Sequence, residues 1–291
     1  MAAPANAEEL QGPPPFFSWA NAWSWAKIIV IILFIKGCVI DQYTVPSGSM
    51  EPTIHGHPGY FTGDRILVNK WLYGIRIPFT TTWLHRWDAP KRWDIVVFKP
   101  LPHQSNFPIL VKRVVGLPGE KVRIHQGQLY INGKLEPFPD FMPKDEQYFN
   151  REDLHGIIQR TGSQWERANA EGLLSAGPDR KGPVYGCVDE DQYTIVPEGN
   201  YFVLGDNSFE SLDARFWGWL PQERILGPVF AIWWPFSSMR DFSGFSHTWW
   251  GKALIYGIPL AIVGMEVRIQ LSERRRRKLL AERAQAAPQK K

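Results

Sequence analysis

The apolar positions of this 291-residue chain form two outer runs with a set of short segments between them. The first run covers residues 16–40 and is densest at Ile28–Ile35. About twenty apolar residues span the hydrocarbon core of a bilayer. Lys27 and Lys36 interrupt the run, but lysine side chains can extend to an interface. The pattern predicts a transmembrane helix over 16–40 that follows a cytoplasmic tail over 1–15, with an aromatic belt of Trp19, Trp23 and Trp25.

Two other interpretations of this first run are a buried helix of a soluble protein and a cleaved signal peptide. A signal peptide has a basic start and small residues at its cleavage point. Here Glu8 and Glu9 precede the run without any Lys or Arg, and Asp41-Gln42-Tyr43 follows it. The sequence therefore favours an uncleaved anchor, with the buried helix as the open alternative.

The second outer run covers 249–267 and is less regular than the first. It begins with Trp249 and Trp250 and contains Pro259 between two glycines. A run of this length fits a second transmembrane helix or an interfacial or re-entrant helix. The basic residues 274–278 follow it, and the positive-inside rule then predicts that 268–291 is a cytoplasmic tail. If both runs span the membrane, the region between them lies on its outer face, which is periplasmic in a bacterium.

The region between the two runs, residues 41–248, is predicted to be a mostly β, antiparallel domain. Its strands are expected at 94–98, 109–115, 121–124, 128–131, 201–204 and 229–233. Alternation on both sides of His125-Gln126-Gly127 predicts a hairpin, and Asn132-Gly133 predicts a second tight turn. Residues 137–186 are polar and charged, with few periodic apolar positions, and are interpreted as an insertion.

Charge and cysteine content narrow the function classes. The formal net charge is +4, and much of the basic excess lies at 274–278, as a solvated helix end or a cytoplasmic anchor. Nucleic-acid binding is the least favoured interpretation of that run. The chain has only Cys38 and Cys187 and no C-x-x-C pattern, so neither a disulfide framework nor a cysteine metal site is expected.

Three polar segments of the central region carry candidate chemistry. Val45–Ile54 places Ser47 and Ser49 around Gly48 between two prolines, a stiff setting that suits a nucleophile. Lys112 lies among branched apolar residues, where desolvation can lower its pKa enough for it to act as a base. Gly205–Arg215 follows a predicted strand and is dense in polar groups. Each segment alone is common in loops and strands that have no catalytic role.

Together the three segments strongly resemble the type I signal peptidases, which are Ser–Lys proteases of family S26. The family's P-S-x-S-M-x-P-T box matches Pro46–Thr53. Its K-R-x-x-G-x-P-G-D box matches Lys112–Glu120, with Glu120 at the final position. Its G-D-N-x-x-x-S-x-D-S-R box matches Gly205–Arg215, with Ala214 at the penultimate position. The resemblance runs from the first anchor to about Phe236, apart from the insertion.

The resemblance implies roles for individual residues. Ser49 would be the acylated nucleophile and Lys112 the general base. Ser47 and the Ser49 N–H would form the oxyanion hole, and Ser211 would orient the lysine. Asp213 and Arg215 would form a supporting salt bridge. The substrate pockets would include Val45, Met50, Ile54, Val97 and Val111.

The resemblance also implies a substrate and partners. The enzyme would cleave signal peptides from exported preproteins after small residues (A-x-A) through an acyl-enzyme. It would act as a monomer in the bacterial inner membrane beside the export translocon, without metal, organic cofactor or nucleic acid. Self-cleaving Ser–Lys repressors carry a DNA-binding module, and the signal peptidase of the endoplasmic reticulum has His at the Lys112 position. A membrane-tethered scaffold with a dead site is the non-enzymatic alternative.

Overall fold

The computed structural model describes residues 19–59, 62–78, 80–101, 107–142, 147–149 and 194–253, together with 257, 260–261, 263–265, 267–269, 271–272 and 275. The chain divides into two compact units, Met1–Arg240 and Asp241–Lys291. The three polar segments that resemble S26 boxes all belong to the first unit.

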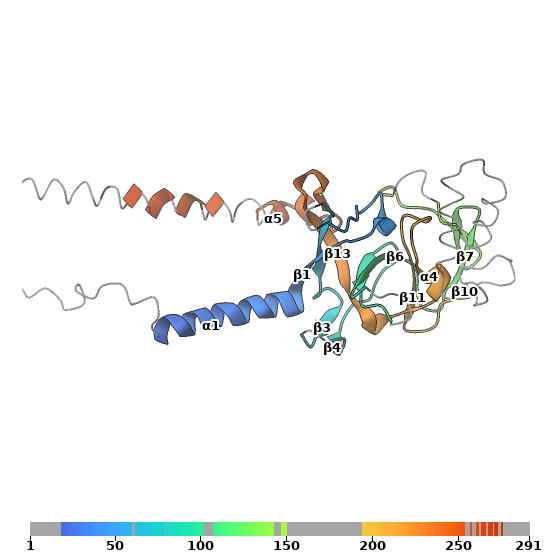
Figure 1. Ribbon diagram of the computed structural model, residues 1–291, viewed down its shortest axis with the longest axis horizontal. Coiled ribbons are helices and arrows are strands. Elements are labelled where there is room, and N and C mark those ends of the chain that lie inside the picture. Colours follow the sequence, from blue (N-terminus) through green and yellow to red (C-terminus); the bar gives the residue numbers. More distant parts are fainter. Residues whose placement is uncertain are drawn as a thin grey trace, which may run out of the picture. The chain divides into compact units, whose positions relative to one another are not determined.

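The first unit is built mainly from antiparallel strands, as the sequence predicted (Figure 1). Its largest sheet runs in the order β1-β2-β13-β5-β6-β11-β12. Strands distant in the chain are neighbours here, because β13 inserts between β2 and β5. The bounds are β1 Ile40–Thr44, β2 Arg65–Asn69, β5 Ile95–Phe98, β6 Leu110–Gly116, β11 Asn200–Leu204, β12 Leu220–Pro221 and β13 Ile225–Trp234.

Two smaller sheets complete the strands of this unit. One has the order β10-β7-β8-β9, and the other pairs β3 with β4. The predicted hairpin is confirmed, with β7 and β8 joined through Gln126 and Gly127 at φ 49° and 79°. The predicted turn after β8 also has positive φ, 53° at Asn132 and 80° at Gly133. The bounds are β3 Gly74–Arg76, β4 Trp83–Arg86, β7 Lys121–His125, β8 Gln128–Ile131, β9 Lys134–Glu136 and β10 Thr194–Ile195.

The hydrophobic core contains residues of both the large sheet and the four-stranded sheet. All four residues of β5 are buried, as are all residues of β6 after Leu110. The first part of the predicted insertion joins this core, because Met142 and Tyr148 are buried and Phe138 packs against the cluster. The remainder of the insertion, 150–186, lies outside the described residues.

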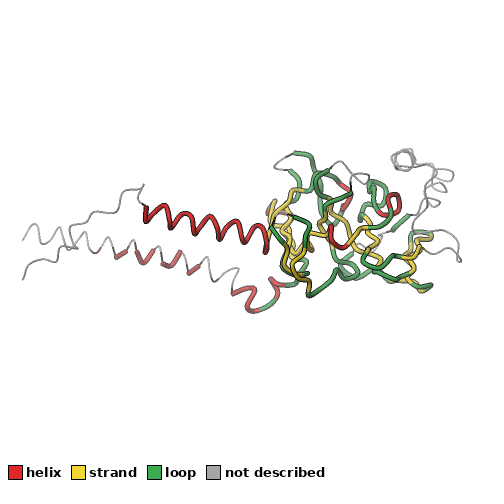
Figure 2. The backbone as a smooth tube through the Cα atoms, turned by 90° about the horizontal axis from the view of Figure 1, so that it is seen from below, coloured by secondary structure: helices red, strands yellow, loops and turns green. Residues whose placement is uncertain are grey.

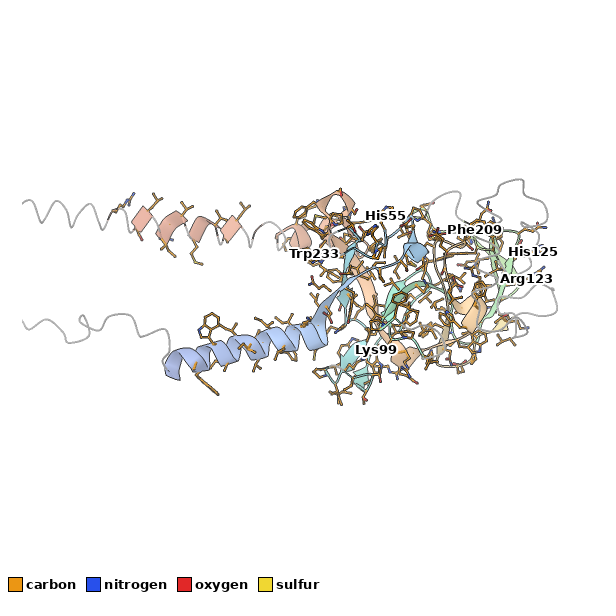
Figure 3. All side chains as sticks on the ribbon, in the orientation of Figure 1. His55, Lys99, Arg123, His125, Phe209 and Trp233 are labelled. Atoms are coloured by element: carbon orange, nitrogen blue, oxygen red, sulfur yellow. The ribbon has the colours of Figure 1, made fainter. Side chains whose placement is uncertain are left out.

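The N-terminal apolar run forms α1 (Trp19–Phe34) and a π-helical turn at Ile35–Val39 before β1 begins. Side chains at Ile28–Ile35 project from the ribbon and are between 45% and 64% exposed (Figure 3). Of the helices described in this chain, none combines the length and apolarity required to cross a membrane. At the end of the run, Cys38 is a buried free thiol.

Short helical turns follow the strands of the first unit. They are η3 (Gly48–Met50), α4 (Ala214–Trp217), η4 (Gln222–Arg224) and η5 (Phe236–Ser238). Strand β14 (Arg240–Asp241) stands at the boundary of the two units, and the second unit contains η6 (Phe245–His247) and α5 (Trp249–Lys252). Figure 2 shows these helices in red and the strands in yellow.

Candidate active site

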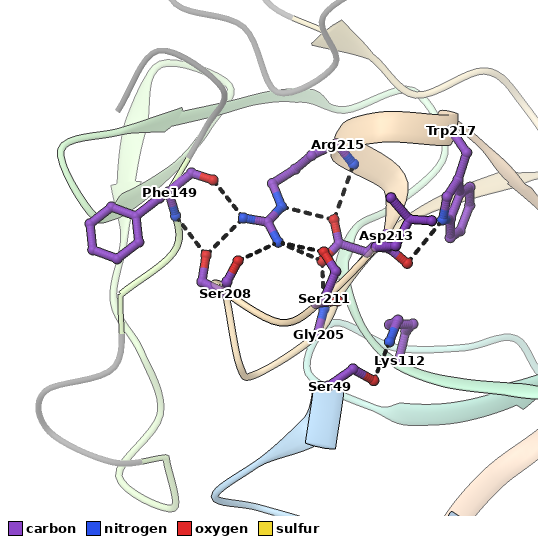
Figure 4. A network of polar contacts seen from close by, with 10 residues as sticks. Ser49, Lys112, Phe149, Gly205, Ser208, Ser211, Asp213, Arg215 and Trp217 are labelled. Atoms are coloured by element: carbon purple, nitrogen blue, oxygen red, sulfur yellow. Dashed lines mark hydrogen bonds and ion pairs between the residues drawn. The ribbon is translucent and has the colours of Figure 1, made fainter. Parts of the chain in front are cut away.

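The predicted nucleophile and base are brought into direct contact. Ser49 lies in the short helix η3, just after β1, and Lys112 lies in the middle of β6. The Lys112 Nζ donates a hydrogen bond to Ser49 Oγ at 2.5 Å (Figure 4). Both side chains are buried, with 7% of Ser49 and 2% of Lys112 exposed. The pair spans 63 positions of the chain, so the fold rather than the local sequence creates this contact.

The surroundings of Lys112 depress its pKa. On β6 it is paired with Val96 of β5 and flanked by Val111. Burial lowers the pKa of Lys112 to about 8, because the charged ammonium loses its hydration. The carboxylate of Asp213 raises this pKa, and the guanidinium of Arg215 lowers it. Lys112 is therefore partly neutral near neutral pH, which a general base requires.

Ser47 stands next to the nucleophile at the start of η3. Its backbone is extended, with φ −133° and ψ 151°, and the 3₁₀ turn begins immediately after it. The Ser47 hydroxyl donates to Ser49 Oγ at 3.4 Å. The two hydroxyls thus lie side by side, with Ser47 on the exposed side of the pair.

Ser211 is buried beneath the nucleophile's own backbone. Its side chain is fully buried, and its Oγ has no hydrogen-bond partner within the described part of the chain. A Cβ at Gly205 would lie 2.1 Å from Ser211 Oγ and 2.4 Å from the Ser49 carbonyl oxygen. Only glycine therefore fits at the start of this loop. The expected role of Ser211, to orient Lys112, stays a prediction.

Arg215 and Asp213 hold the same loop together. The Arg215 guanidinium donates to both Asp213 oxygens, from Nε at 2.8 Å and from Nη2 at 2.9 Å. It also donates to Ser208 Oγ at 2.7 Å and to the carbonyl oxygens of Phe149 and Ser211 (Figure 4). Asp213 in turn accepts from the Gly205 N–H at 3.0 Å. The expected salt bridge is present, and it fixes the loop on which Ser211 lies.

A second buried ion pair was missed from the sequence. Arg113, the residue after the base, donates to Asp206 from Nε at 2.7 Å and from Nη2 at 2.5 Å. The side chains are 1% and 0% exposed. Arg113 also donates to the Trp93 carbonyl oxygen, and Tyr148 donates to Asp206. Arg113 and Asp206 lie inside the matched boxes, beside Lys112 and Gly205. Their positions in the boxes were the sequence signal that could have indicated this ion pair.

A hollow opens beside Ser49, and its lining only partly matches the predicted pocket. Val45 and Val111 line it, as expected. Met50, Ile54 and Val97 are fully buried and lie outside its lining. The sequence did not indicate the other lining residues, which are Thr44, Pro46, Phe107, Ile109 and Leu110 beside the two active-site serines.

The strand that carries Lys112 has an open edge at this hollow. β6 pairs with β5 from Leu110 to Arg113. On its other side, β11 pairs with β6 only from Arg113 to Gly116. Among the described residues, the edge of Leu110–Lys112 on that side has no strand partner. An extended chain could therefore add here as a further strand.

Among the described residues, this site contains no group of side chains that could bind a metal ion. Across the residues that the structure describes, no group of three or more His, Cys, Asp or Glu side chains could hold a metal ion.

Comparison with known proteins identifies the family. A family model described as "Signal peptidase, peptidase S26" matches residues 18–234. The chain belongs to this family. Signal peptidase I of Pseudomonas aeruginosa is 32% identical over 257 residues, which cover 84% of this chain and 82% of the relative. Signal peptidase I of Buchnera aphidicola subsp. Baizongia pistaciae is 33% identical, with 72% and 74% covered. That of Aquifex aeolicus is 31% identical, with 70% and 80% covered.

Membership of the S26 signal peptidases confirms that the chain is a serine peptidase. The two departures from the family's boxes have local explanations. Glu120 accepts from both terminal nitrogens of Arg92, at 2.6 and 3.0 Å, and from the Leu117 N–H at 2.7 Å. Ala214 is fully buried at the start of α4, next to the Asp213 cap. Neither position contacts Ser49 or Lys112 through a hydrogen bond in the described structure.

Proposed function

We propose that this S26 peptidase cleaves its substrate with Ser49 as nucleophile and Lys112 as general base. The 2.5 Å contact between Lys112 Nζ and Ser49 Oγ carries the proposal. The pKa of about 8 for Lys112 supports it, because about a tenth of the lysine is then neutral at pH 7. A lysine with its ordinary pKa would be almost entirely protonated and could not accept the serine proton.

The reaction passes through an acyl-enzyme. Neutral Lys112 accepts the Ser49 hydroxyl proton while Oγ attacks the scissile carbonyl carbon. The Ser49 N–H and the Ser47 hydroxyl donate to the oxyanion that forms. Collapse breaks the C–N bond, and the Lys112 ammonium returns its proton to the leaving amine. Lys112 then takes a proton from water, which attacks the ester carbonyl carbon. As the bond from this carbon to Ser49 Oγ breaks, Lys112 returns the proton to Oγ, and the new C-terminal carboxyl group leaves.

The substrate is a preprotein cleaved after small residues in an A-x-A pattern. Its extended segment adds to the open edge of Leu110–Lys112, with backbone hydrogen bonds as in other strand additions. The apolar side chains of Val45 and Val111 line the hollow beside Ser49 and suit small side chains. The signal peptide is then the part of the substrate that supplies the acyl group on Ser49.

The proposed setting is the outer face of a bacterial inner membrane, beside the export translocon. The exposed apolar side chains of Ile28–Ile35 support an anchor there, because a bilayer would remove them from water. The basic residues 274–278 support a cytoplasmic C-terminal tail. The enzyme acts as a monomer and uses no cofactor.

The test is cleavage of a preprotein that carries an A-x-A site, with the full chain in detergent or liposomes. Ser49→Ala and Lys112→Ala should each abolish processing while the protein still folds. Ser237→Ala and Lys121→Ala change exposed residues and should process at the wild-type rate. Processing by Ser49→Ala or Lys112→Ala at the rate of the wild type contradicts the proposed dyad.

A further inference from the structure

A glycine outside the matched boxes lies against the backbone of Ser47. Gly56 belongs to the segment that follows the nucleophile box, next to His55, which is labelled in Figure 3. A Cβ built at Gly56 would lie 1.7 Å from the Ser47 carbonyl oxygen and 2.0 Å from its carbonyl carbon. It would also lie 2.7 Å from the Ser47 N. These are backbone atoms, so no side-chain rotation could relieve the overlap.

Backbone hydrogen bonds fasten the same segment to Val45. The His57 N–H donates to the Val45 carbonyl oxygen at 3.1 Å, and the Val45 N–H donates to the Asp64 carbonyl oxygen at 3.1 Å. The segment also closes on itself, because Asp64 N–H donates to the His55 carbonyl oxygen and His55 N–H donates to Asp64 Oδ2. Asp64 is 1% exposed, so this closure is shielded from water.

Val45–Ser47 also lines the hollow, because Val45 and Ser47 are among its lining residues together with residues of the β6 edge. The stretch that would receive the substrate is thus also the stretch that contacts Gly56, His57 and Asp64. Any displacement of Ser47 would move both the wall of the hollow and the hydroxyl next to Ser49.

We infer that Gly56 is a positioning residue, which holds the Ser47 backbone and thereby sets where the Ser47 hydroxyl stands relative to Ser49. The inference rests on the proposed function, in which Ser47 supplies an oxyanion donor. Gly56 acts through Ser47: movement of the wall of the hollow should change KM, whereas movement of the Ser47 hydroxyl should change kcat. Its effect on kcat should therefore depend on whether the Ser47 hydroxyl is present.

Three glycines near this turn allow a graded comparison. Gly56→Ala places a Cβ at 1.7 Å from backbone, whereas Gly63→Ala places one at 2.8 Å from the Val45 carbonyl oxygen. Gly59→Ala is the matched control in the same segment, because the three described atoms nearest to its Cβ belong to the side chains of Thr62 and His57. Both of those side chains are exposed and can move. The loss of kcat should decrease in the order Gly56→Ala, Gly63→Ala, Gly59→Ala, with the last near wild type.

The deciding experiment is a double-mutant cycle of Gly56→Ala with Ser47→Ala, measured as kcat per active site on an A-x-A peptide. The concentration of active sites is measured by acylation of Ser49. Unfolded protein is then left out of the concentration by which the rate is divided to give kcat. Loss of an oxyanion donor costs about 100- to 1,000-fold, and we expect Ser47→Ala and Gly56→Ala each to fall near that range. In the Ser47→Ala background, Gly56→Ala should cost less than about threefold more.

The outcomes separate this inference from the proposed function. If Ser47→Ala alone keeps the wild-type kcat, the proposed oxyanion donor is wrong. If Ser47→Ala is slow but Gly56→Ala multiplies the loss by the same factor in both backgrounds, the positioning role of Gly56 is wrong. If Gly56→Ala does not fold, it is combined with Ser47→Gly, which loosens the backbone that the Cβ would meet. Recovery of folding in that double variant supports the contact through Ser47, and a double variant that still does not fold overturns the inference.

Discussion

Lys112 combines two properties that oppose each other in a folded protein. It is almost completely buried, and its only hydrogen bond in the described structure goes to Ser49. Burial lowers its pKa to about 8, while the unfolded chain would keep the ordinary value of 10.5. The same desolvation that would let the amine act as a base therefore destabilises the folded state wherever the amine is protonated.

The pH dependence of cleavage follows from this pKa. Because the neutral amine accepts the proton, kcat/KM should rise by about tenfold per pH unit below pH 8 and level off above it. The profile is measured on a short A-x-A peptide between about pH 6 and pH 9. Lys121→Ala removes an exposed lysine and should leave the profile unchanged. A rate independent of pH over this range would rule out Lys112 as the titrating base.

Replacement of Lys112 should abolish cleavage and raise the free energy of unfolding. Lys112→Met keeps the length of the side chain and removes the buried charge, so the free energy of unfolding at pH 7 should rise by up to about 3 kcal/mol. The folded lysine binds fewer protons than the unfolded one between about pH 8 and 10.5. The wild type should therefore gain stability across that window, and the difference from the variant should shrink.

Denaturant unfolding of both proteins at pH 7 and at pH 10 measures this difference. Lys121→Met serves as the control, because an exposed lysine carries little desolvation cost. A variant that is less stable than the wild type at pH 7 would show that the buried amine is not a net cost.

At the scale of elements, the strands were largely predictable and their partners were not. Runs of branched residues and the alternation around Gln126-Gly127 predicted β5, β6 and the β7–β8 hairpin close to their observed bounds. The local sequence does not indicate which strands pair when they are far apart in the chain. β13 inserts between β2 and β5, and Arg113 meets Asp206 across 93 positions. Of the expected pocket residues, Val45 and Val111 line the hollow and Met50 does not, and local sequence could not show this because the burial of Met50 depends on what packs over it.

The loop Gly205–Arg215 is the element on which the site depends most directly. Arg215→Ala removes the hydrogen bonds to Asp213, Ser208 and the Phe149 carbonyl oxygen, and leaves the Asp213 carboxylate buried without its partner. We expect a loss of about 3–5 kcal/mol in the free energy of unfolding. We also expect a lower kcat, because Gly205 and Ser211 lose their support.

Denaturant midpoints at constant m-value measure the stability loss. Lys91→Ala breaks an ion pair in which the lysine is 75% exposed, and its cost should stay below about 0.5 kcal/mol. A midpoint for Arg215→Ala equal to that of Lys91→Ala would show that the network does not stabilise the fold.

At the scale of the whole molecule, the two apolar runs are proposed to anchor the catalytic unit at a membrane. The proposed topology places 41–248 outside the cytoplasm and the basic residues 274–278 inside. Protease added to the outer face of spheroplasts should therefore leave a C-terminal epitope intact and digest it only after lysis. An epitope placed after Glu136 is the control and should be accessible in intact spheroplasts. Digestion of the C-terminal epitope without lysis would overturn the two-anchor topology.

If the substrate adds to the edge of β6 as proposed, this edge also limits when a substrate can be cut. Among the described residues, Leu110–Lys112 has no strand partner on the side opposite β5, and an α-helix has already used its own N–H and C=O groups internally. Neither a helix nor a strand already paired on both sides can bind such an edge. The preprotein must therefore have an extended, unfolded segment at the scissile bond. Cleavage thus competes with folding of the first residues after the signal peptide. A preprotein in which those residues are already folded would keep its signal peptide.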